Sequence, residues 1–291
     1  MTEKINSHIP LVSIGMFVYN GESCIRDSIE SILSQSYKDF EFIISDNAST
    51  DDTQNICKEY AKKDSRIRYI RQSKNIGATA NCLFVLDEAI GEYFIWAAHD
   101  DIKSENFLEV NLKFLQKNPD YIASTSPVKF KDGMPDPVKM GDQSLNQETA
   151  QERFFDCINA WTGCGRFYSL IRRSALIDNV TLRRGAYLGQ DIAVILELAI
   201  KGKLNRTSEG YVALGRNGLS GSQTIYRTYR NSLLNWFIPL HEFNVQIWSF
   251  SSSFSFKNKA QLAITMLKMN LISSLHQIKT ELKLLLAEKL N

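Results

Sequence analysis

The sequence predicts an α/β fold with a mostly parallel central sheet and a helical C-terminal appendage. In the first half of the chain, short apolar runs rich in β-branched residues alternate with stretches whose apolar residues recur every three or four positions. This alternation is typical of βαβ units, which build a parallel sheet covered by helices on both faces. Beyond residue 221 the strand pattern disappears and helical spacing continues. We therefore expect a large domain at 1–221 and a helical segment at 222–291.

The first elements follow from local patterns of apolar and turn-forming residues. Residues 11–18 (LVSIGMFV) are apolar and β-branched, as in a buried strand, and Tyr19-Asn20-Gly21 supplies a turn. Residues 22–35 then carry isoleucine and leucine at helical spacing. The alternation continues with predicted strands at 40–45, 67–70 and 93–97 and predicted helices at 51–63, 78–89 and 106–117. Right-handed crossovers place the loops that follow these strands along one edge, where α/β sheets bind ligands.

A long loop and a second group of elements follow. Residues 131–147 contain prolines and glycines, which predicts a loop over the surface or the site. After it we expect helices at 152–159 and 191–201, a strand at 166–171, and strands near Leu204 and Tyr211.

Composition and charge exclude several classes of protein. The chain has 291 residues with 34 basic and 32 acidic side chains, a net charge of +2, which argues against nucleic acid as the partner. Its five cysteines are widely spaced with no CxxC pair, so we expect neither a disulfide framework nor a structural zinc site. The N-terminal residues are polar, without the apolar core of a secretory signal, and no apolar run is long enough to span a bilayer. These features predict a cytoplasmic protein.

Three acidic clusters follow predicted strands or begin a predicted helix. Asp46 comes directly after the strand at 40–45, where a carboxylate can accept hydrogen bonds from a nucleotide, although a role in capping the next helix is open. Asp100 and Asp101 follow the strand at 93–97, and such adjacent carboxylates suit Mg²⁺ or Mn²⁺; a solvated turn is the alternative. Asp191 begins the helix at 191–201, where the helix dipole also favours an aspartate.

The markers of several other enzyme classes are absent from the sequence. No GxGxxG follows the first strand and no GxxxxGK[ST] occurs, which disfavours a dinucleotide-binding fold and a P-loop nucleotidase. Neither GxSxG nor HExxH occurs, so a hydrolase triad and a zinc protease lack their signatures.

Taken in order, these motifs resemble those of the inverting family 2 glycosyltransferases, which have the GT-A fold. The resemblance covers residues 9–222. Each motif is moderately specific, but all of them occur in the family's order and at similar spacing. The segments that carry it are PLVSIGMFVYNGE, SILSQSYKDFEFIISDNASTDDT, NIGATANCLFVLDEAIGEYFIWAAHDD and GQDIAVILELAIKG.

The resemblance implies a nucleotide-binding role for residues that follow the first two strands. By position, Tyr19, Glu22 and Asp46 would hold the base and ribose of the donor, with Tyr19 stacking and Asp46 accepting from the ring N–H. Arg216 lies in the glycine-rich stretch LGRNGLSGS, which could fold over a diphosphate; an exposed loop arginine is the alternative.

The resemblance also implies a metal ligand and a catalytic base. Asp101 would bind the Mn²⁺ or Mg²⁺ ion that bridges the diphosphate, and Asp100 would contact ribose or metal. The first position of the family's D-x-D motif is His99 here, a departure that leaves the role of this residue open. Asp191 would be the general base, which takes the proton of the acceptor hydroxyl as the bond forms.

For the acceptor side, the resemblance places Trp161 and Phe167 along the pocket, with core packing as the alternative. The Q-x-x-R-W motif of processive members is absent, which indicates transfer of a single sugar. The implied reaction is transfer from a nucleotide sugar, a UDP-sugar by resemblance, to a glycan or lipid-linked acceptor, in the synthesis of a surface polysaccharide or other glycan. A sugar nucleotidyltransferase and a non-catalytic nucleotide-sugar-binding module are the alternatives.

The C-terminal segment differs in charge from the rest of the chain. Residues 222–291 hold eight basic and three acidic side chains, a balance of +5, which leaves −3 for residues 1–221. From 264 to 285, isoleucine and leucine recur every three or four residues, which predicts one long amphipathic helix. Residues 233–256 carry two tryptophans and five phenylalanines with one acidic residue, Glu242. We expect these C-terminal helices to pack on the catalytic domain or on a second subunit in a homo-oligomer. The alternative is a peripheral contact with the inner face of the membrane.

Overall fold

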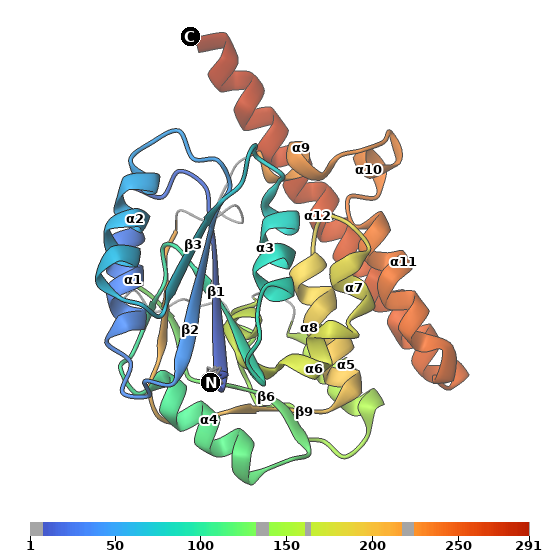
Figure 1. Ribbon diagram of the computed structural model, residues 1–291. Helices are drawn as coiled ribbons and strands as arrows, with labels where there is room; N and C mark the ends of the chain where they lie inside the picture. The colour runs from blue at the N-terminus through green and yellow to red at the C-terminus, as the bar shows by residue number, and fades with distance from the viewer. Residues whose placement is uncertain (1–7, 132–139, 161–163, 217–223, 291) are drawn as a thin grey trace.

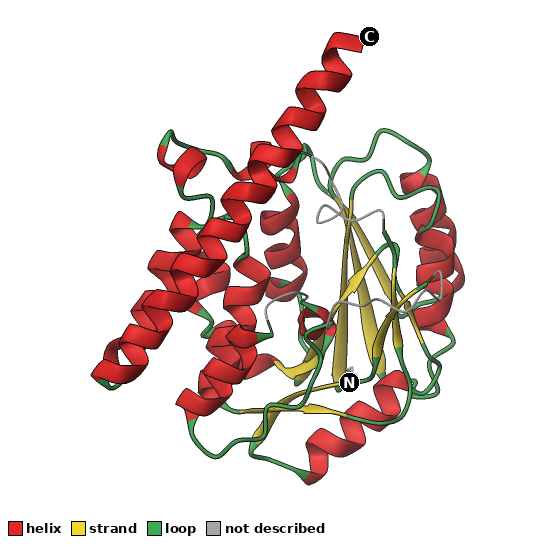
Figure 2. Cartoon of the chain, turned by 180° about the vertical axis from the view of Figure 1, so that it is seen from behind, coloured by secondary structure: helices red, strands yellow, loops and turns green. Residues whose placement is uncertain are grey.

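The computed structural model describes residues 8–131, 140–160, 164–216 and 224–290, with no side-chain description for 288–290. Its centre is a seven-stranded sheet in the order β3-β2-β1-β4-β8-β6-β9 (Figures 1 and 2). The strands are β1 (Val12–Val18), β2 (Phe40–Asp46), β3 (Ile67–Arg71), β4 (Tyr93–Ala98), β6 (Tyr121–Thr125), β8 (Leu170–Arg172) and β9 (Lys203–Arg206). All neighbouring pairs are parallel except those that involve β8. The predicted mostly parallel sheet is therefore confirmed.

A second, smaller sheet has three strands in the order β5-β10-β7. Its members are β5 (Ile102–Lys103), β7 (Val128–Phe130) and β10 (Val212–Leu214). Because β5 directly follows β4 in the chain, this sheet brings the end of β10 next to the residues that follow β4.

Helices cover both faces of the central sheet (Figure 1). The strands alternate in the side chains that they bury: Ile14 and Ile95 join the core beneath α1, α2 and α4, whereas Phe94 and Trp96 join the core beneath α3 and α8. This period of two is what a strand buried on both faces requires. The bounds are α1 (Ile25–Leu33), α2 (Thr53–Lys63), α3 (Ala78–Asp87), α4 (Phe107–Lys117), α5 (Ala150–Asn159), α6 (Arg173–Ile177), α7 (Val180–Arg183) and α8 (Gln190–Lys201).

One predicted strand is wrong in its bounds, and two strands that follow α4 were not predicted. The expected strand at 166–171 is instead a 3₁₀ turn (Gly165–Tyr168) followed by the short strand β8. Strands β6 and β7, with the turn residues Ser126 and Pro127 between them, were not expected at all. The predicted strands near Leu204 and Tyr211 correspond to β9 and β10.

The C-terminal segment is helical throughout the part that the structure describes, as expected. It comprises α9 (Ile225–Tyr229), α10 (Leu234–Phe237), α11 (His241–Ser249), a 3₁₀ turn (Phe250–Ser253) and the long helix α12 (Phe256–Leu290). Phe243 and Ile247 of α11 and Met269 of α12 share a hydrophobic core with Phe154 of α5 and Leu196 of α8. The boundary that we predict at 221/222 lies outside the described residues. Among the described helices, none is both long and apolar enough to cross a membrane.

The apolar stripe of α12 does not pack on the catalytic domain. Leu267 and Leu271 are exposed, and so are the other isoleucines and leucines of that stripe. The buried side of the helix carries Met269, Ser273 and Gln277 instead. The helix therefore lies with its more polar side against the protein.

Candidate active site

The loops that follow β1, β2 and β4 meet at one edge of the central sheet. The parallel register pairs Val18 with Asp46 and Phe17 with Ala98, so the residues that follow these strands are neighbours in space. This edge is where a parallel sheet with helices on both faces binds ligands. Tyr19, Asp46 and the pair Asp100–Asp101 are therefore brought together, as the sequence predicts.

The loop after β1 is bonded to the loop after β2. Backbone N–H groups of Asn20 and Gly21 donate to the hydroxyls of Ser49 (2.9 Å) and Thr53 (2.8 Å). In return, Oδ1 of Asn20 accepts from the backbone N–H of Thr50 (2.8 Å). Tyr19 stands at the head of this connection with an exposed ring, so its face is open for stacking.

Glu22 belongs to the same connection between the two loops. One of its carboxylate oxygens accepts from the backbone N–H of Asp52 (2.8 Å), and its own N–H donates to Asp51 (3.1 Å). The structure therefore shows Glu22 holding the turn before α2. Its predicted contact with the nucleotide stays a prediction.

Asp46 is completely buried, and protein groups surround its carboxylate. Its Oδ1 accepts from the backbone N–H of Ser49 (2.8 Å), and Oδ2 accepts from the Tyr69 hydroxyl (2.7 Å) and from Nη1 of Arg71 (2.6 Å). Burial acts to raise the pKa of this carboxyl, but these hydrogen bonds outweigh it and the pKa is lowered. Arg71 forms an ion pair with Asp46, and its side chain is 32% exposed. The sequence reasoning missed this residue. Its signal was a basic residue at the end of β3, in register with Asp46.

Asp101 is buried beneath the loop that follows β10. Its Oδ1 accepts from the backbone N–H of Gly215 (2.8 Å), whereas its buried Oδ2 has no hydrogen-bond partner in the part of the chain that is described. Burial raises its pKa to about 6, an effect that the ammonium of Lys103 opposes. A Cβ atom at Gly215 would lie 2.3 Å from Oδ2 of Asp100, so only glycine lets this loop approach. Asp100 and Asp101 are thus held tightly between β4 and β10.

Two further groups surround the acidic pair. Burial lowers the pKa of the Lys103 ammonium to about 8, against the effect of Asp101, which raises it. Burial likewise lowers the pKa of His99, although Asp100 raises it. The His99 ring packs on the turn after β1, because a Cβ at Gly21 would lie 2.8 Å from its Cδ2. His99 therefore links two of the three loops, and this contact is the role that the structure supports for it.

Asp191 lies in the first turn of α8, two residues after Gly189, whose φ of 83° is left-handed. The side chain is accessible to solvent, yet enough protein surrounds it that desolvation raises the pKa of its carboxyl. Hydrogen bonds from backbone N–H groups and from the thiol of Cys164 act in the opposite direction. An accessible carboxylate with a raised pKa is what a general base needs.

Tyr168 connects the metal motif with Asp191. Burial raises the pKa of its phenol well above the usual value, and the charges of Asp101, Asp100 and Asp191 raise it further. The charges of Asp101 and Asp191 thus both act on this one phenol, although Asp191 follows Asp101 by 90 positions. The sequence reasoning missed Tyr168 because it expected a strand here instead of a 3₁₀ turn.

Two aromatic residues were predicted to line an acceptor pocket, and the structure describes one of them. Phe167 is buried and its ring stacks on Trp96, with ring centroids 4.5 Å apart and planes at 11°. It belongs to the core, so the prediction that it lines an acceptor pocket is wrong. Trp161 lies outside the described residues. Arg216, at the end of the described loop, is exposed and its guanidinium lies 3.9 Å from the centre of the Phe130 ring.

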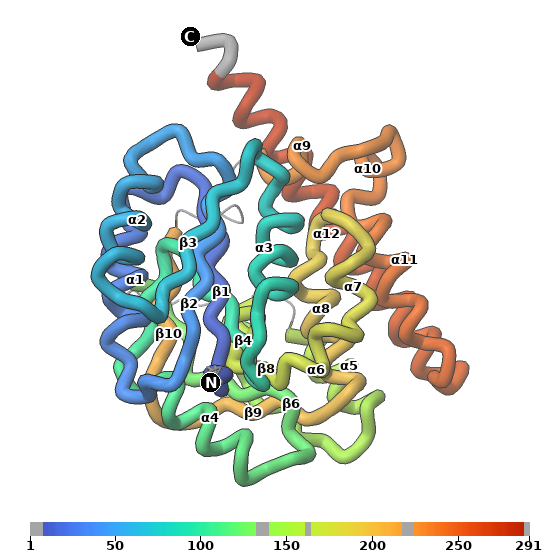
Figure 3. The backbone as a smooth tube through the Cα atoms, in the orientation of Figure 1, coloured from blue at the N-terminus to red at the C-terminus, as the bar shows by residue number. Residues whose placement is uncertain are grey.

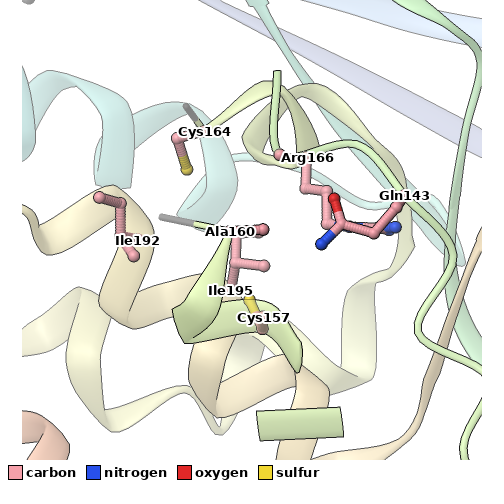
Figure 4. A pocket seen from close by; sticks show the side chains of 8 residues that line it. Gln143, Cys157, Ala160, Cys164, Arg166, Ile192 and Ile195 are labelled. Atoms are coloured by element: carbon pink, nitrogen blue, oxygen red, sulfur yellow. The ribbon is translucent and has the colours of Figure 1, made fainter. Parts of the chain in front are cut away.

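A small cavity lies beside α8 (Figure 4). Cys164, Arg166 and Ile192 are among its lining residues, and its volume is about 10 Å³, room for about one water molecule. Burial lowers the pKa of Arg166 to about 10, and its guanidinium has no hydrogen-bond partner among the described residues. The cavity is too small for a sugar, so the candidate site is the open edge of the sheet and not this cavity.

The fold and the acidic groups at its edge define the GT-A class of α/β proteins. The Glycosyl transferase family 2 model matches residues 13–179, more than half of the chain. The chain belongs to this family.

Known proteins agree with this assignment. EpsE of Bacillus subtilis, named as a glycosyltransferase, is 42% identical over 113 residues, 38% of this chain and 41% of EpsE; the match thus spans about two fifths of that relative. TuaG of the same organism, named for a proposed role as a glycosyltransferase of teichuronic acid biosynthesis, is 29% identical over 77% of this chain and 81% of its own. TarS 1–349 of S. aureus, in complex with UDP-GlcNAc, has a TM-score of 0.58 at 18% identity and covers 87% of this chain and 79% of its own. The last likeness shows the fold alone.

Proposed function

We propose that this chain transfers one sugar from a nucleoside-diphospho-sugar, a UDP-sugar, to a hydroxyl of a glycan or lipid-linked acceptor. Membership of the family, the UDP-GlcNAc in the TarS complex and the naming of TuaG for a polysaccharide support this proposal. The observation that carries it is that the strand register brings Tyr19, Asp46 and the pair Asp100–Asp101 to one edge of the sheet. An acidic pair that can hold a cation, beside an open aromatic face, fits the binding of a nucleoside diphosphate.

The residues present fit a divalent cation at Asp101. Oδ2 of Asp101 is buried and has no hydrogen-bond partner among the described residues. Such a carboxylate oxygen is a ligand that Mn²⁺ or Mg²⁺ favours. Within the described residues, no group of three or more His, Cys, Asp or Glu side chains gathers to hold a metal. The donor diphosphate and water would therefore complete the coordination, as is common for Mg²⁺. When bound, the cation supplies Lewis-acid stabilisation of the leaving diphosphate.

Asp191 takes the part of general base in this proposal. A new bond forms between the acceptor oxygen and the anomeric carbon while the bond from that carbon to the diphosphate oxygen breaks. The hydroxyl proton passes to the Asp191 carboxylate, and the electron pair of the broken bond leaves with the nucleoside diphosphate. Attack opposite the leaving group inverts the anomeric configuration, so no covalent sugar–enzyme intermediate is needed.

The nucleotide would lie over the loops after β1 and β2. The exposed ring of Tyr19 offers a stacking face, and Glu22 and Asp46 lie in the same pair of bonded loops. Asp100 would contact ribose, and Arg216, exposed above Phe130, would reach the diphosphate. Arg71 adds a cation beside Asp46, and its guanidinium N–H groups can donate hydrogen bonds to the nucleotide when it binds.

The test is release of UDP from a panel of UDP-sugars with Mn²⁺, with and without EDTA. We expect turnover that EDTA abolishes. Asp191→Asn should remove transfer by about 10²- to 10⁴-fold, the usual contribution of a general base, while the thermal shift on addition of UDP stays that of wild type. Asp101→Asn should abolish the stimulation of sugar transfer by Mn²⁺. Asp87→Asn, at an exposed side chain, is the matched control and should leave activity unchanged.

Several outcomes would overturn the proposal. Pyrophosphate released from a nucleoside triphosphate would identify a nucleotidyltransferase. Binding of nucleotide sugar without any turnover would identify a binding module. Full activity in EDTA would exclude the metal role of Asp101, and retained transfer by Asp191→Asn would exclude the base.

A further inference from the structure

The long helix α12 presents a continuous apolar stripe to solvent. The side chains recur every three or four residues over more than five turns, and Leu267 is 71% exposed. Single exposed leucines are ordinary on a protein surface, but a contiguous stripe of this length marks an interaction surface. We define the α12 stripe as Ile264, Leu267, Leu271, Leu275, Ile278, Leu282 and Leu285.

The orientation of α12 is fixed by specific polar contacts on its other side. Glu281 is buried and accepts hydrogen bonds from both Arg227 and Arg230. Gln277, also buried, donates to the backbone carbonyl of Trp236 (3.3 Å). A rotation of the helix that buried the α12 stripe would break these bonds and expose the bonded groups. The outward position of the stripe is therefore a property of the fold.

Exposed aromatic side chains also lie on α10, on α11 and at the start of α12. Phe237 of α10 and Trp248 of α11 are exposed, and Phe256 at the start of α12 is 90% exposed. The ring of Trp236, also exposed, carries the guanidinium of Arg230 at 3.6 Å from its centre. Tryptophan and phenylalanine beside basic groups are typical of helices that lie in the interface of a bilayer.

The charges of α12 decide what covers the stripe. Among the residues whose side chains are described, the exposed charged side chains of α12 are all lysines: Lys257, Lys268, Lys279 and Lys283. The one acidic side chain described there, Glu281, is buried and paired. An anionic surface is complementary to these lysines.

We propose that the α12 stripe and its lysines bind the surface of a bilayer that contains anionic phospholipid. The leucines and isoleucines enter the boundary between headgroups and acyl chains, and the lysines contact the phosphates. The proposal rests on the C-terminal helices alone, so it stands separately from the transfer activity. Figures 1 and 2 show the C-terminal end of α12 projecting past the body at the edge toward which β1 runs.

The test is cosedimentation of the full chain with phosphatidylcholine vesicles, with and without phosphatidylglycerol. We expect binding only to the vesicles that contain phosphatidylglycerol, and weaker binding as salt rises. Replacing Lys268, Lys279 and Lys283 by Gln should weaken binding roughly 100-fold, since each lysine contributes about fivefold near an anionic surface. A triple Lys→Gln control at Lys58, Lys62 and Lys117, which are exposed on α2 and α4, should bind as wild type.

A double variant tests the apolar side chains of the α12 stripe, and sedimentation equilibrium tests whether the chain self-associates. Leu271→Ser with Leu275→Ser should abolish binding to vesicles while the melting temperature stays that of wild type, because both side chains are exposed. Sedimentation equilibrium should show a monomer. Failure of wild type to bind anionic vesicles at low salt would overturn the proposal. So would a dimer that this double variant dissociates, since a second copy would then cover the stripe.

Discussion

Glu281→Gln tests how the C-terminal helices contribute to the site. Glu281 of α12 accepts from Nε (3.0 Å) and Nη2 (2.8 Å) of Arg227 in α9, and from Nη2 of Arg230. Tyr229 lies between these arginines in the chain, and the charge of Asp191 contributes to its raised pKa, after burial. Thr79 of α3 hydrogen-bonds Tyr229 as well, and Figure 3 shows α9 beside the end of α3. The carboxylate of Glu281 thus holds α9 beside the candidate base.

The expected loss of stability follows from these three hydrogen bonds. A hydrogen bond to a charged group contributes about 1.5–3 kcal/mol when it is buried. The Arg227 side chain is 37% exposed, so its pair with Glu281 is screened and contributes about 1 kcal/mol or less. Arg230 is 16% exposed and its bond keeps about 1.5–2 kcal/mol. Glu281→Gln should therefore lower the free energy of unfolding by about 2–3 kcal/mol and the melting temperature by roughly 5 °C.

The assay combines thermal melts with transfer kinetics. Beyond the lower melting temperature, we expect slower sugar transfer while the affinity for UDP stays that of wild type, because α9 lies by Asp191 and the nucleotide loops lie after β1 and β2. The matched control is Glu59→Gln on α2, which also accepts from two cations, Arg26 and Lys63, but is 43% exposed. It should melt close to wild type. The reasoning is refuted if Glu281→Gln melts and turns over like wild type, or if both variants lose the same stability.

Three more predictions concern the sheet and its edge. Gly215→Ala should lower kcat/KM roughly 10- to 100-fold with the fold retained by circular dichroism, because its Cβ would meet Asp100 at 2.3 Å and displace the N–H that binds Asp101; wild-type kinetics would contradict this. Phe167→Ala should cost about 3–5 kcal/mol in urea unfolding, since a fully packed ring is removed from Trp96, whereas an acceptor role would change KM and leave stability alone. Asp46→Asn should destabilise the protein at pH 7. Because the pKa of Asp46 in the folded protein is lowered below 3.8, the difference in stability between wild type and variant should shrink as the pH falls through and below about 4. A difference in stability that is independent of pH would exclude the ionised carboxylate as its source.

The central strands could be predicted because each is a short apolar run that ends in a turn or an acidic group. For β1, β2 and β4 the predicted bounds differ from the observed ones by one residue at most. The same patterns placed Asp46, Asp100 and Asp101 at one edge, because parallel strands bring their carboxyl ends together. Strand β6 escaped prediction since it ends in Ser124 and Thr125, polar residues whose burial depends on partners elsewhere in the sheet.

Other features depend on contacts between distant parts of the chain. Helical spacing predicted α12 correctly, but spacing does not tell which side packs; the arginines that bind Glu281 lie more than 50 positions away. The approach of Tyr168 to Asp101 and Asp191 arises from the 3₁₀ turn before β8, which no local pattern indicated. Phe167 resembled a sugar-stacking residue because an aromatic in a glycine-rich stretch looks the same whether it faces Trp96 or solvent.

The bonded loops after β1 and β2 bear on the entropy of donor recognition. The hydrogen bonds that join Asn20 and Gly21 to Ser49, Thr50 and Thr53 form when the chain folds. The conformational freedom of this surface is therefore lost before any nucleotide arrives, and binding does not have to order it again. A preorganised surface of this kind favours fast association with little backbone rearrangement.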